Sequence, residues 1–174
     1  MEIGRGLAQN EVDREQTDQF NDWRAGRQNK ACRDYSRLTD WEGNCRGPVA
    51  VCPPKDGETA QEAQQRLDYI GRANAVIKAP LVRVPTEPLR KAVDRAARAE
   101  RKAHPDKYAN GLVPGHVPDT TWGGSPVPPG GWLPMTPRLN GSIGGQSGAY
   151  PIGYRASRFV FGQWLGGRCL AVTQ

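Results

Sequence analysis

The sequence predicts an α+β fold, in which a helical N-terminal part is followed by a Gly/Pro-rich irregular part with a few short strands. The first observation is a change of composition along the 174 residues. Residues 1–107 hold 20 of the 24 Lys and Arg and 17 of the 18 Asp and Glu, but only 7 of the 21 Gly. The second is that residues 108–174 hold 14 Gly and 8 of the 15 Pro, which favour turns and loops. The third is the length, which suits one ordinary domain.

Two helices are predicted before residue 80. The earlier one covers residues 8–38, where apolar side chains recur at roughly helical intervals in a polar background: Val12, Phe20, Trp23 and Ala31. The later one covers residues 60–78, because Thr59 and Glu62 have the spacing of a capping box and Pro80 prevents continuation. One inward face is expected from Ala63, Leu67, Ile70 and Ile77.

A third helix is predicted over residues 87–103, with Thr86 as N-cap and Pro88 in the first turn. Its inward residues are expected to be Leu89, Ala92, Val93 and Ala96. The other face carries six cations, Arg90, Lys91, Arg95, Arg98, Arg101 and Lys102. Because acidic residues are interleaved with them, a solvated face is favoured, and a phosphate-binding face is the alternative.

In the second part, only residues 158–165 have the pattern of a buried strand, because Phe159, Val160, Phe161 and Trp164 are too apolar for an exposed edge. Glycine allows tight turns and a close approach of the backbone to a ligand. We expect such conformations at Gly123, Gly124, Gly130, Gly131, Gly144 and Gly145.

The charge balance favours a polyanionic partner. The net charge of +6 makes nucleic acid the leading candidate, with a basic protein that has no such partner as the alternative. No stretch approaches the roughly 20 apolar residues of a membrane span, so no membrane partner is expected. Residues 1–10 lack the basic and apolar regions of a secretory signal. Export would then need a dedicated apparatus or a larger parent chain.

The four cysteines carry little information by their spacing. Cys32, Cys45, Cys52 and Cys169 lack the paired C-x-x-C spacing of a zinc site and have no nearby histidine. Two disulfides are possible, but we expect ordinary thiols in a chain that acts in a cytosol.

His116 and Asp119 are the strongest candidates for chemistry. Histidine exchanges protons near neutral pH, and a carboxylate three residues later, across Pro118, can lie on the same side of a turn. The pair could hold a divalent metal, or Asp119 could orient His116 as a base. H-x-x-D alone is a weak signal, and a simple turn is the alternative. Asp119 is, however, the single carboxylate after residue 107.

Four segments around this pair resemble the novel toxin 15 family of bacterial polymorphic toxins. They are the run GHVPDTTWGG from Gly115, the run PPGGW, residues 140–146 and residues 150–154. The resemblance covers roughly residues 100–165 and places the family's H-x-x-D on His116 and Asp119. It implies a DNase effector that is associated with type VI secretion and neutralised by a cognate immunity protein.

A looser likeness links the Gly115-His116 pair and the downstream Asn140 to the His-metal finger nucleases. In such enzymes the histidine activates water and an asparagine binds the metal. Carried over, His116 is the general base and Asn140 a metal ligand. The further His or Asn usual on a following helix is not evident.

The sequence therefore predicts a toxin nuclease that hydrolyses DNA phosphodiester bonds in the cytoplasm of a target cell. Residues 1–58 are expected to form a helical or linker region and residues 59–174 the nuclease domain, unless 1–174 are one domain. Asp119 and Asn140 would hold Mg²⁺ as cofactor. Substrate contacts are expected from Thr120, Thr121, Gln146 and Arg101. An RNase with metal-free histidine chemistry, a nucleic-acid-binding module and an adaptor region remain alternatives.

Overall fold

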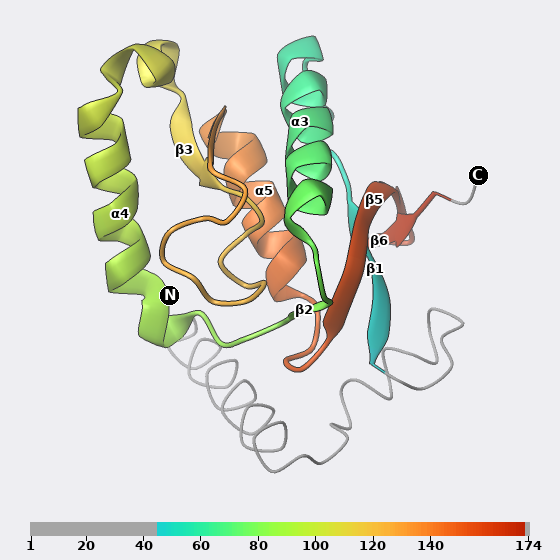
Figure 1. Ribbon diagram of the computed structural model, residues 1–174. Helices are drawn as coiled ribbons and strands as arrows, with labels where there is room; N and C mark the ends of the chain where they lie inside the picture. Colours follow the sequence, from blue (N-terminus) through green and yellow to red (C-terminus); the bar gives the residue numbers. More distant parts are fainter. Residues whose placement is uncertain (1–44, 173–174) are drawn as a thin grey trace, which may run out of the picture.

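The structure is a computed structural model that describes residues 45–172 (Figure 1). It has the predicted mixed α+β class, whereas the helix expected over residues 8–38 lies outside the described residues. The strands are β1 (Arg46–Val51), β2 (Leu81–Val82), β3 (Val113–His116), β4 (Trp132–Met135), β5 (Arg155–Leu165) and β6 (Arg168–Ala171). The α-helices are α3 (Ala60–Val76), α4 (Arg90–Ala103) and α5 (Pro137–Gly148). Two 3₁₀ helices cover Glu87–Leu89 and Pro105–Gly111.

Strand β5 is the centre of the sheet. It pairs with β1 in parallel, and with β2 and β6 in antiparallel orientation. The strand predicted over residues 158–165 is confirmed and begins three residues earlier, at Arg155. The prediction that its apolar residues are all buried is wrong in part, because Phe159 is buried but Phe161 is 40% exposed. Because β1 precedes α3 and pairs with β5, the sheet joins residues 46–51 to the part of the chain that follows residue 59.

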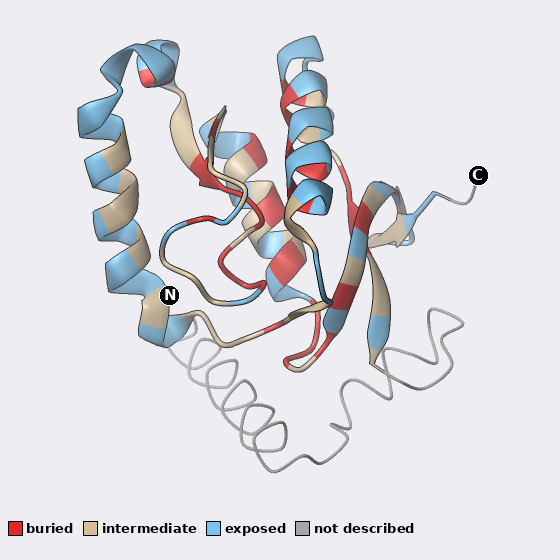
Figure 2. Cartoon of the chain, viewed as in Figure 1, coloured by how far each residue is buried: buried red, intermediate tan, exposed pale blue. Residues whose placement is uncertain are grey.

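The core lies between this sheet and helices α3 and α5 (Figure 2). Trp122 is at its centre, 1% exposed, and its ring meets those of Tyr150, Tyr154 and Phe159. The β3–β4 hairpin contacts α4 and α5 from its own separate two-stranded sheet. None of the helices in residues 45–172 is long and apolar enough to cross a membrane.

The capping box of α3 is formed as predicted. The Thr59 hydroxyl accepts from the Glu62 N–H at 3.1 Å, and the Glu62 carboxylate accepts from the Thr59 N–H at 3.0 Å. The predicted inward face is wrong in part, because Leu67 is 47% exposed while Glu62 and Gln65 are buried. Those two polar side chains accept hydrogen bonds from Thr136 at the start of α5, at 2.7 and 3.1 Å. Glu62 and Gln65 are therefore buried because the N-terminal turns of α3 meet the start of α5. The periodicity of apolar residues in α3 does not reveal this contact.

Helix α5 is a correction to the sequence prediction, which placed an irregular segment with glycine turns here. Four glycines in twelve residues oppose a helix. Local signals at the N-terminus oppose that preference: Thr136 caps the helix by accepting from the Leu139 N–H at 3.1 Å, and Pro137 suits its first position. Leu139, Ile143 and Ser147 form its buried face.

Helix α4 begins later than expected. Residues 87–89 form a 3₁₀ turn, and Thr86 makes no side-chain capping hydrogen bond. Val93 and Ala96 are half-buried, but Ala92 is exposed and α4 has no fully buried residue. The helix therefore presents most of its surface, including its six cations, to solvent.

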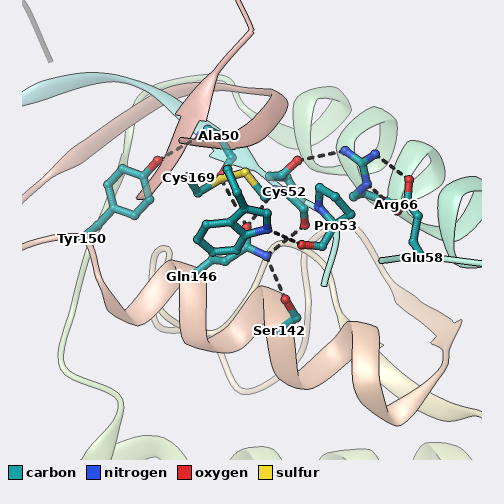
Figure 3. The surroundings of a disulfide bond; sticks show 11 residues. Ala50, Cys52, Pro53, Glu58, Arg66, Ser142, Gln146, Tyr150 and Cys169 are labelled. Atoms are coloured by element: carbon teal, nitrogen blue, oxygen red, sulfur yellow. Dashed lines mark hydrogen bonds and ion pairs between the residues drawn. A yellow bond between two sulfur atoms is a disulfide. The ribbon is translucent and has the colours of Figure 1, made fainter. Parts of the chain in front are cut away.

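The described cysteines are disulfide-bonded, so the expectation of ordinary thiols is wrong. Cys52 and Cys169, which are 117 residues apart, form one bond (Figure 3). Cys45 is also disulfide-bonded, and none of the described cysteines is free. The sheet explains the pairing: Cys52 follows β1 and Cys169 lies in β6, and both strands pair with β5. The spacing of Cys52 and Cys169 in the sequence does not indicate that they lie close together in the fold.

Acid is expected to destabilise the fold through Glu62. The hydrogen bond from Arg138 lowers the pKa of this carboxyl to about 2 from its ordinary 4.5, against the opposite effect of burial, and Thr59 and Thr136 contribute further lowering. A carboxyl with a lowered folded-state pKa stabilises the fold above the unfolded pKa, and this contribution is lost as the pH falls toward the folded one. The free energy of unfolding should therefore decrease from about pH 4.5 to about pH 2.

Urea unfolding at a series of pH values measures this effect. In Glu62→Gln the decrease should be shallower, and the variant should be less stable than the parent at neutral pH because Arg138 loses its buried anionic partner and keeps only the exposed Asp56. Asp68→Asn, on the exposed side of the same helix, is the matched control. Parallel pH profiles for Glu62→Gln and the parent would contradict the assignment.

Candidate active site

The candidate residues lie at the end of β3, where His116 is the last residue, and in the loop that follows it, which carries Asp119. Its turn is closed by a hydrogen bond from the Trp122 N–H to the Asp119 carbonyl at 2.9 Å, and the Val117–Pro118 peptide bond is cis. Trp122 anchors the loop in the core and pairs through an isolated bridge with Arg83. The loop is therefore held at both ends by packed structure.

The Asp119 carboxylate has two different environments. Its Oδ1 accepts hydrogen bonds from the backbone N–H of Thr121 at 3.0 Å and from the Thr121 hydroxyl at 2.5 Å. Its Oδ2 lies against Gly144 of α5, where a Cβ atom would stand 3.6 Å from it. The Asp119 N–H donates to the Tyr69 hydroxyl at 2.8 Å. Thr121 thus fixes the carboxylate and Tyr69 fixes the backbone of Asp119, with Oδ2 turned toward the glycine-lined side of α5.

A cavity of about 260 Å³, which we call the Asp119 pocket, opens beside this carboxylate. Its walls come from the segment after β2, the first turns of α4, the Asp119 loop and α5. They are formed by Arg83, Thr86, Arg90, Val93, Asp94, Asp119, Thr120, Thr121, Gly144 and Gly148. The absence of side chains at the two glycines leaves space for a ligand next to the acid.

Arg83 supplies a buried positive charge to this pocket. Only 2% of the residue is exposed, and its guanidinium donates to the carbonyls of Tyr150, Val84 and Gly148. Burial lowers the pKa of Arg83, and the nearby charge of Asp119 opposes that shift. Burial, and secondly the charge of Asp119, raise the pKa of Tyr69 above its usual range. Both residues therefore lie in the electrostatic field of Asp119.

His116 is buried, 7% exposed, and both of its ring nitrogens contact carbonyl oxygens. Nδ1 lies 2.5 Å from the Pro118 carbonyl, and Nε2 lies 2.6 Å from the Ser125 carbonyl. A neutral imidazole has one N–H, so only the doubly protonated ring can donate to both. The ring also meets Trp132 edge-on, at 5.5 Å between centroids. In this conformation both ring nitrogens of His116 contact carbonyls of the loop that carries Asp119. Neither nitrogen is free to accept a proton from water.

The structure therefore separates the roles of the two predicted residues. Asp119 lines the pocket, whereas His116 is outside its lining and contacts the backbone on either side of Asp119. Thr120 and Thr121 line the pocket as well, both nearly buried.

The other predicted contacts lie elsewhere. Asn140 lies one helical turn before Gly144 on α5, and its Oδ1 faces Gly115 of β3, so it is near the pocket but outside its lining. Gln146 is on another side of α5, where its amide bonds the Cys52 N–H and carbonyl at 2.8 and 2.9 Å (Figure 3). Arg101 is exposed near the end of α4 and donates to the Leu112 carbonyl.

Sequence reasoning missed Arg83, Asp94 and Tyr69. One signal was present for Arg83, which is the one charged residue in the apolar run from Leu81 to Val84. A buried cation needs polar partners, and such a position is often part of a site. Nothing in the sequence points to Asp94, which lies among the alternating charges of α4.

Within residues 45–172 there is no group of three or more His, Cys, Asp or Glu side chains placed to hold a metal ion. The pocket does contain two carboxylates, Asp119 and Asp94, with the hydroxyl-bearing Thr120. This sparse oxygen set is compatible with Mg²⁺, which retains several waters and gains ligands from substrate phosphates.

Comparison of the chain with protein-family models, curated proteins and solved structures finds no match.

Proposed function

We propose that the chain is a toxin nuclease that hydrolyses phosphodiester bonds of DNA in the cytoplasm of a target bacterial cell. The observation that carries the proposal is the Asp119 pocket, where a fixed carboxylate lies with a buried arginine beside the cationic helix α4. Phosphate binding favours arginine, and phosphodiester hydrolysis requires stabilisation of charge that develops on phosphate oxygens. The H-x-x-D resemblance supports the same centre.

In this proposal the residues of the pocket have distinct roles. Arg90 lies at the rim and contacts the DNA backbone, while the exposed cations of α4 extend the same positive surface along the strand. Thr121 keeps one oxygen of Asp119 occupied, so the other oxygen is the one that acts on the substrate side. His116 positions Asp119 through its hydrogen bonds to the loop. Its use as a general base requires the Ser125 carbonyl to move away from Nε2.

Mg²⁺ is the proposed cofactor, with Asp119 and Asp94 as the carboxylates that would hold it. When bound, the ion would stabilise negative charge on the phosphate and activate a water molecule. The charge of Arg83 weakens cation binding in the absence of DNA, because like charges repel in a partly buried site. The DNA phosphate therefore contributes to ion affinity.

The proposed function implies two partners of the protein. A cognate immunity protein would protect the producing cell, and a type VI-like secretion apparatus or a larger parent effector would deliver the chain. The net charge of +6 favours an acidic contact surface on the immunity protein.

The test is incubation of the purified protein with plasmid DNA and, separately, with RNA, in EDTA and then in increasing Mg²⁺. We expect DNA cleavage that EDTA abolishes and Mg²⁺ restores, with RNA left intact. Full activity in EDTA would contradict the metal-dependent mechanism and favour metal-free chemistry by a histidine. DNA and RNA that both stay intact under all conditions would favour a binding or adaptor module.

A further inference from the structure

A second and larger cavity, of about 520 Å³, lies between α5 and the β5–β6 hairpin. We call it the α5–β6 pocket, and it is lined by Lys55, Ser142, Gly145, Gln146, Ala149, Tyr150, Trp164, Gly167, Arg168 and Cys169. Its volume is within the roughly 300–1,000 Å³ of pockets that hold small ligands. The residues that α5 contributes to it differ from Gly144 and Gly148, which face the Asp119 pocket. The same helix therefore separates two cavities.

Among residues 45–172, the charged residues that line the α5–β6 pocket are Lys55 and Arg168, both positive, and no carboxylate of this part of the chain lines it. The Lys55 Nζ lies over the Trp164 ring, 4.9 Å from its centroid. The indole is fixed because its N–H donates to the Pro53 carbonyl at 2.7 Å. The pocket therefore offers an immobilised aromatic ring with a cation over it.

The polar groups of the pocket floor already have partners. The Gln146 amide bonds the backbone of Cys52 and donates to the Ser142 hydroxyl at 2.9 Å (Figure 3). The Tyr150 hydroxyl accepts from the Ala50 N–H at 2.9 Å. Recognition in this pocket then depends on positive charge and on the aromatic ring. An aromatic ring with adjacent cations is the arrangement by which proteins bind single-stranded nucleic acid.

We propose that the α5–β6 pocket binds a nucleotide of a single DNA strand, with its phosphate at Lys55 and Arg168 and its base against Trp164. The inference rests on the proposed function, because it places part of the same substrate on the far side of α5 from Asp119. A helix with its side chains is about 10 Å across, so one strand that passes over α5 can reach both cavities. The strand can pass close to the α5 backbone at Gly141 and Gly145, because neither residue has a side chain. The space beside each is open, since a Cβ there would meet nothing within 4 Å.

The test measures binding of a labelled single strand of about 12 nucleotides by fluorescence anisotropy, in an Asp119→Asn background that prevents cleavage. Gly145→Leu fills the pocket, and the fold should tolerate it because the position is helical and opens into empty space. Lys55→Glu reverses one charge at an exposed position. We expect each variant to raise the Kd at least about tenfold, the size expected for loss of one stacked or phosphate-bound nucleotide. Gly71→Leu on α3, which also opens into empty space but belongs to neither pocket lining, is the matched control and should bind as the parent does.

Unchanged affinity in both Gly145→Leu and Lys55→Glu would overturn the inference. A second arm replaces the strand by deoxyadenosine monophosphate. If this nucleotide binds as tightly as the strand, the pocket holds a free nucleotide and the assignment to a DNA strand is overturned.

Plasmid cleavage by the parent protein is scored separately. A parent that cleaves DNA, with pocket variants that bind normally, contradicts only this inference. A parent that cleaves nothing, with pocket variants that lose strand binding, contradicts only the proposed function.

Discussion

Asp119→Asn is expected to abolish DNA cleavage, with a loss of about 10²–10³-fold or more. The substitution preserves the shape of the side chain, so its remaining oxygen can still accept from the Thr121 N–H and hydroxyl. It removes the negative charge at Oδ2, which is the atom that faces the pocket. Cleavage of supercoiled plasmid at several enzyme concentrations measures the loss, and urea unfolding shows that the variant is folded. Full activity in a folded Asp119→Asn protein would refute the site.

A comparison with two neighbouring residues sharpens this result. Thr121→Val removes one of the two hydrogen bonds to Oδ1 but keeps the charge, so its loss of activity should be smaller. His116→Ala should lose stability as well as activity, by about 1–3 kcal/mol, because the buried Pro118 carbonyl and the half-buried Ser125 carbonyl lose their contacts with the ring. The three variants therefore separate a residue that acts on substrate from residues that hold it in place.

Removal of the Cys52–Cys169 disulfide is expected to lower the free energy of unfolding by about 2–5 kcal/mol. The bond joins residues 117 apart, and a cross-link over a long segment restricts the unfolded chain strongly. It also ties the end of β1 to β6, which is a strand of only four residues. The double variant Cys52→Ala/Cys169→Ala should therefore unfold at much lower urea concentration than the parent.

The double variant is compared with the parent under oxidising conditions, which isolates this bond because Cys45 retains its own disulfide. Gly162→Ala is an independent check of the packing. A Cβ at that position would lie 2.7 Å from the Cys52 sulfur and 2.9 Å from the Cys169 sulfur. Equal unfolding midpoints for the parent and the cysteine double variant would contradict the stabilising role.

Local signals in the sequence were sufficient for α3 and β5. A capping box and a following proline define the ends of α3, and a dense apolar run marks β5 as an inner strand. These features depend on residues that are close in the chain. The buried position of Glu62 depends instead on Arg138, which is 76 residues away.

The candidate site could be predicted only in part for the same reason. Asp119, Thr120 and Thr121 were grouped in the sequence because they are consecutive, and all three line the same pocket. The motif did not reveal that both ring nitrogens of His116 contact carbonyl oxygens, because the Ser125 carbonyl is brought to the ring only by the fold of the loop. Nor did it separate Gln146 from Asp119, because α5 was not expected and the two residues lie on different sides of it.

The parallel pairing of β1 with β5 has a consequence for the synthesis of the protein. β1 is made before β5, which begins more than 100 residues later, at Arg155. A growing chain that has only just produced Asp119 also lacks Gly144 and the carbonyls of Gly148 and Tyr150 that hold Arg83. Non-local contacts of this kind form late in folding. The Asp119 pocket can therefore be completed only after residues 144–150 have left the ribosome, so a growing chain that ends before them carries no assembled site.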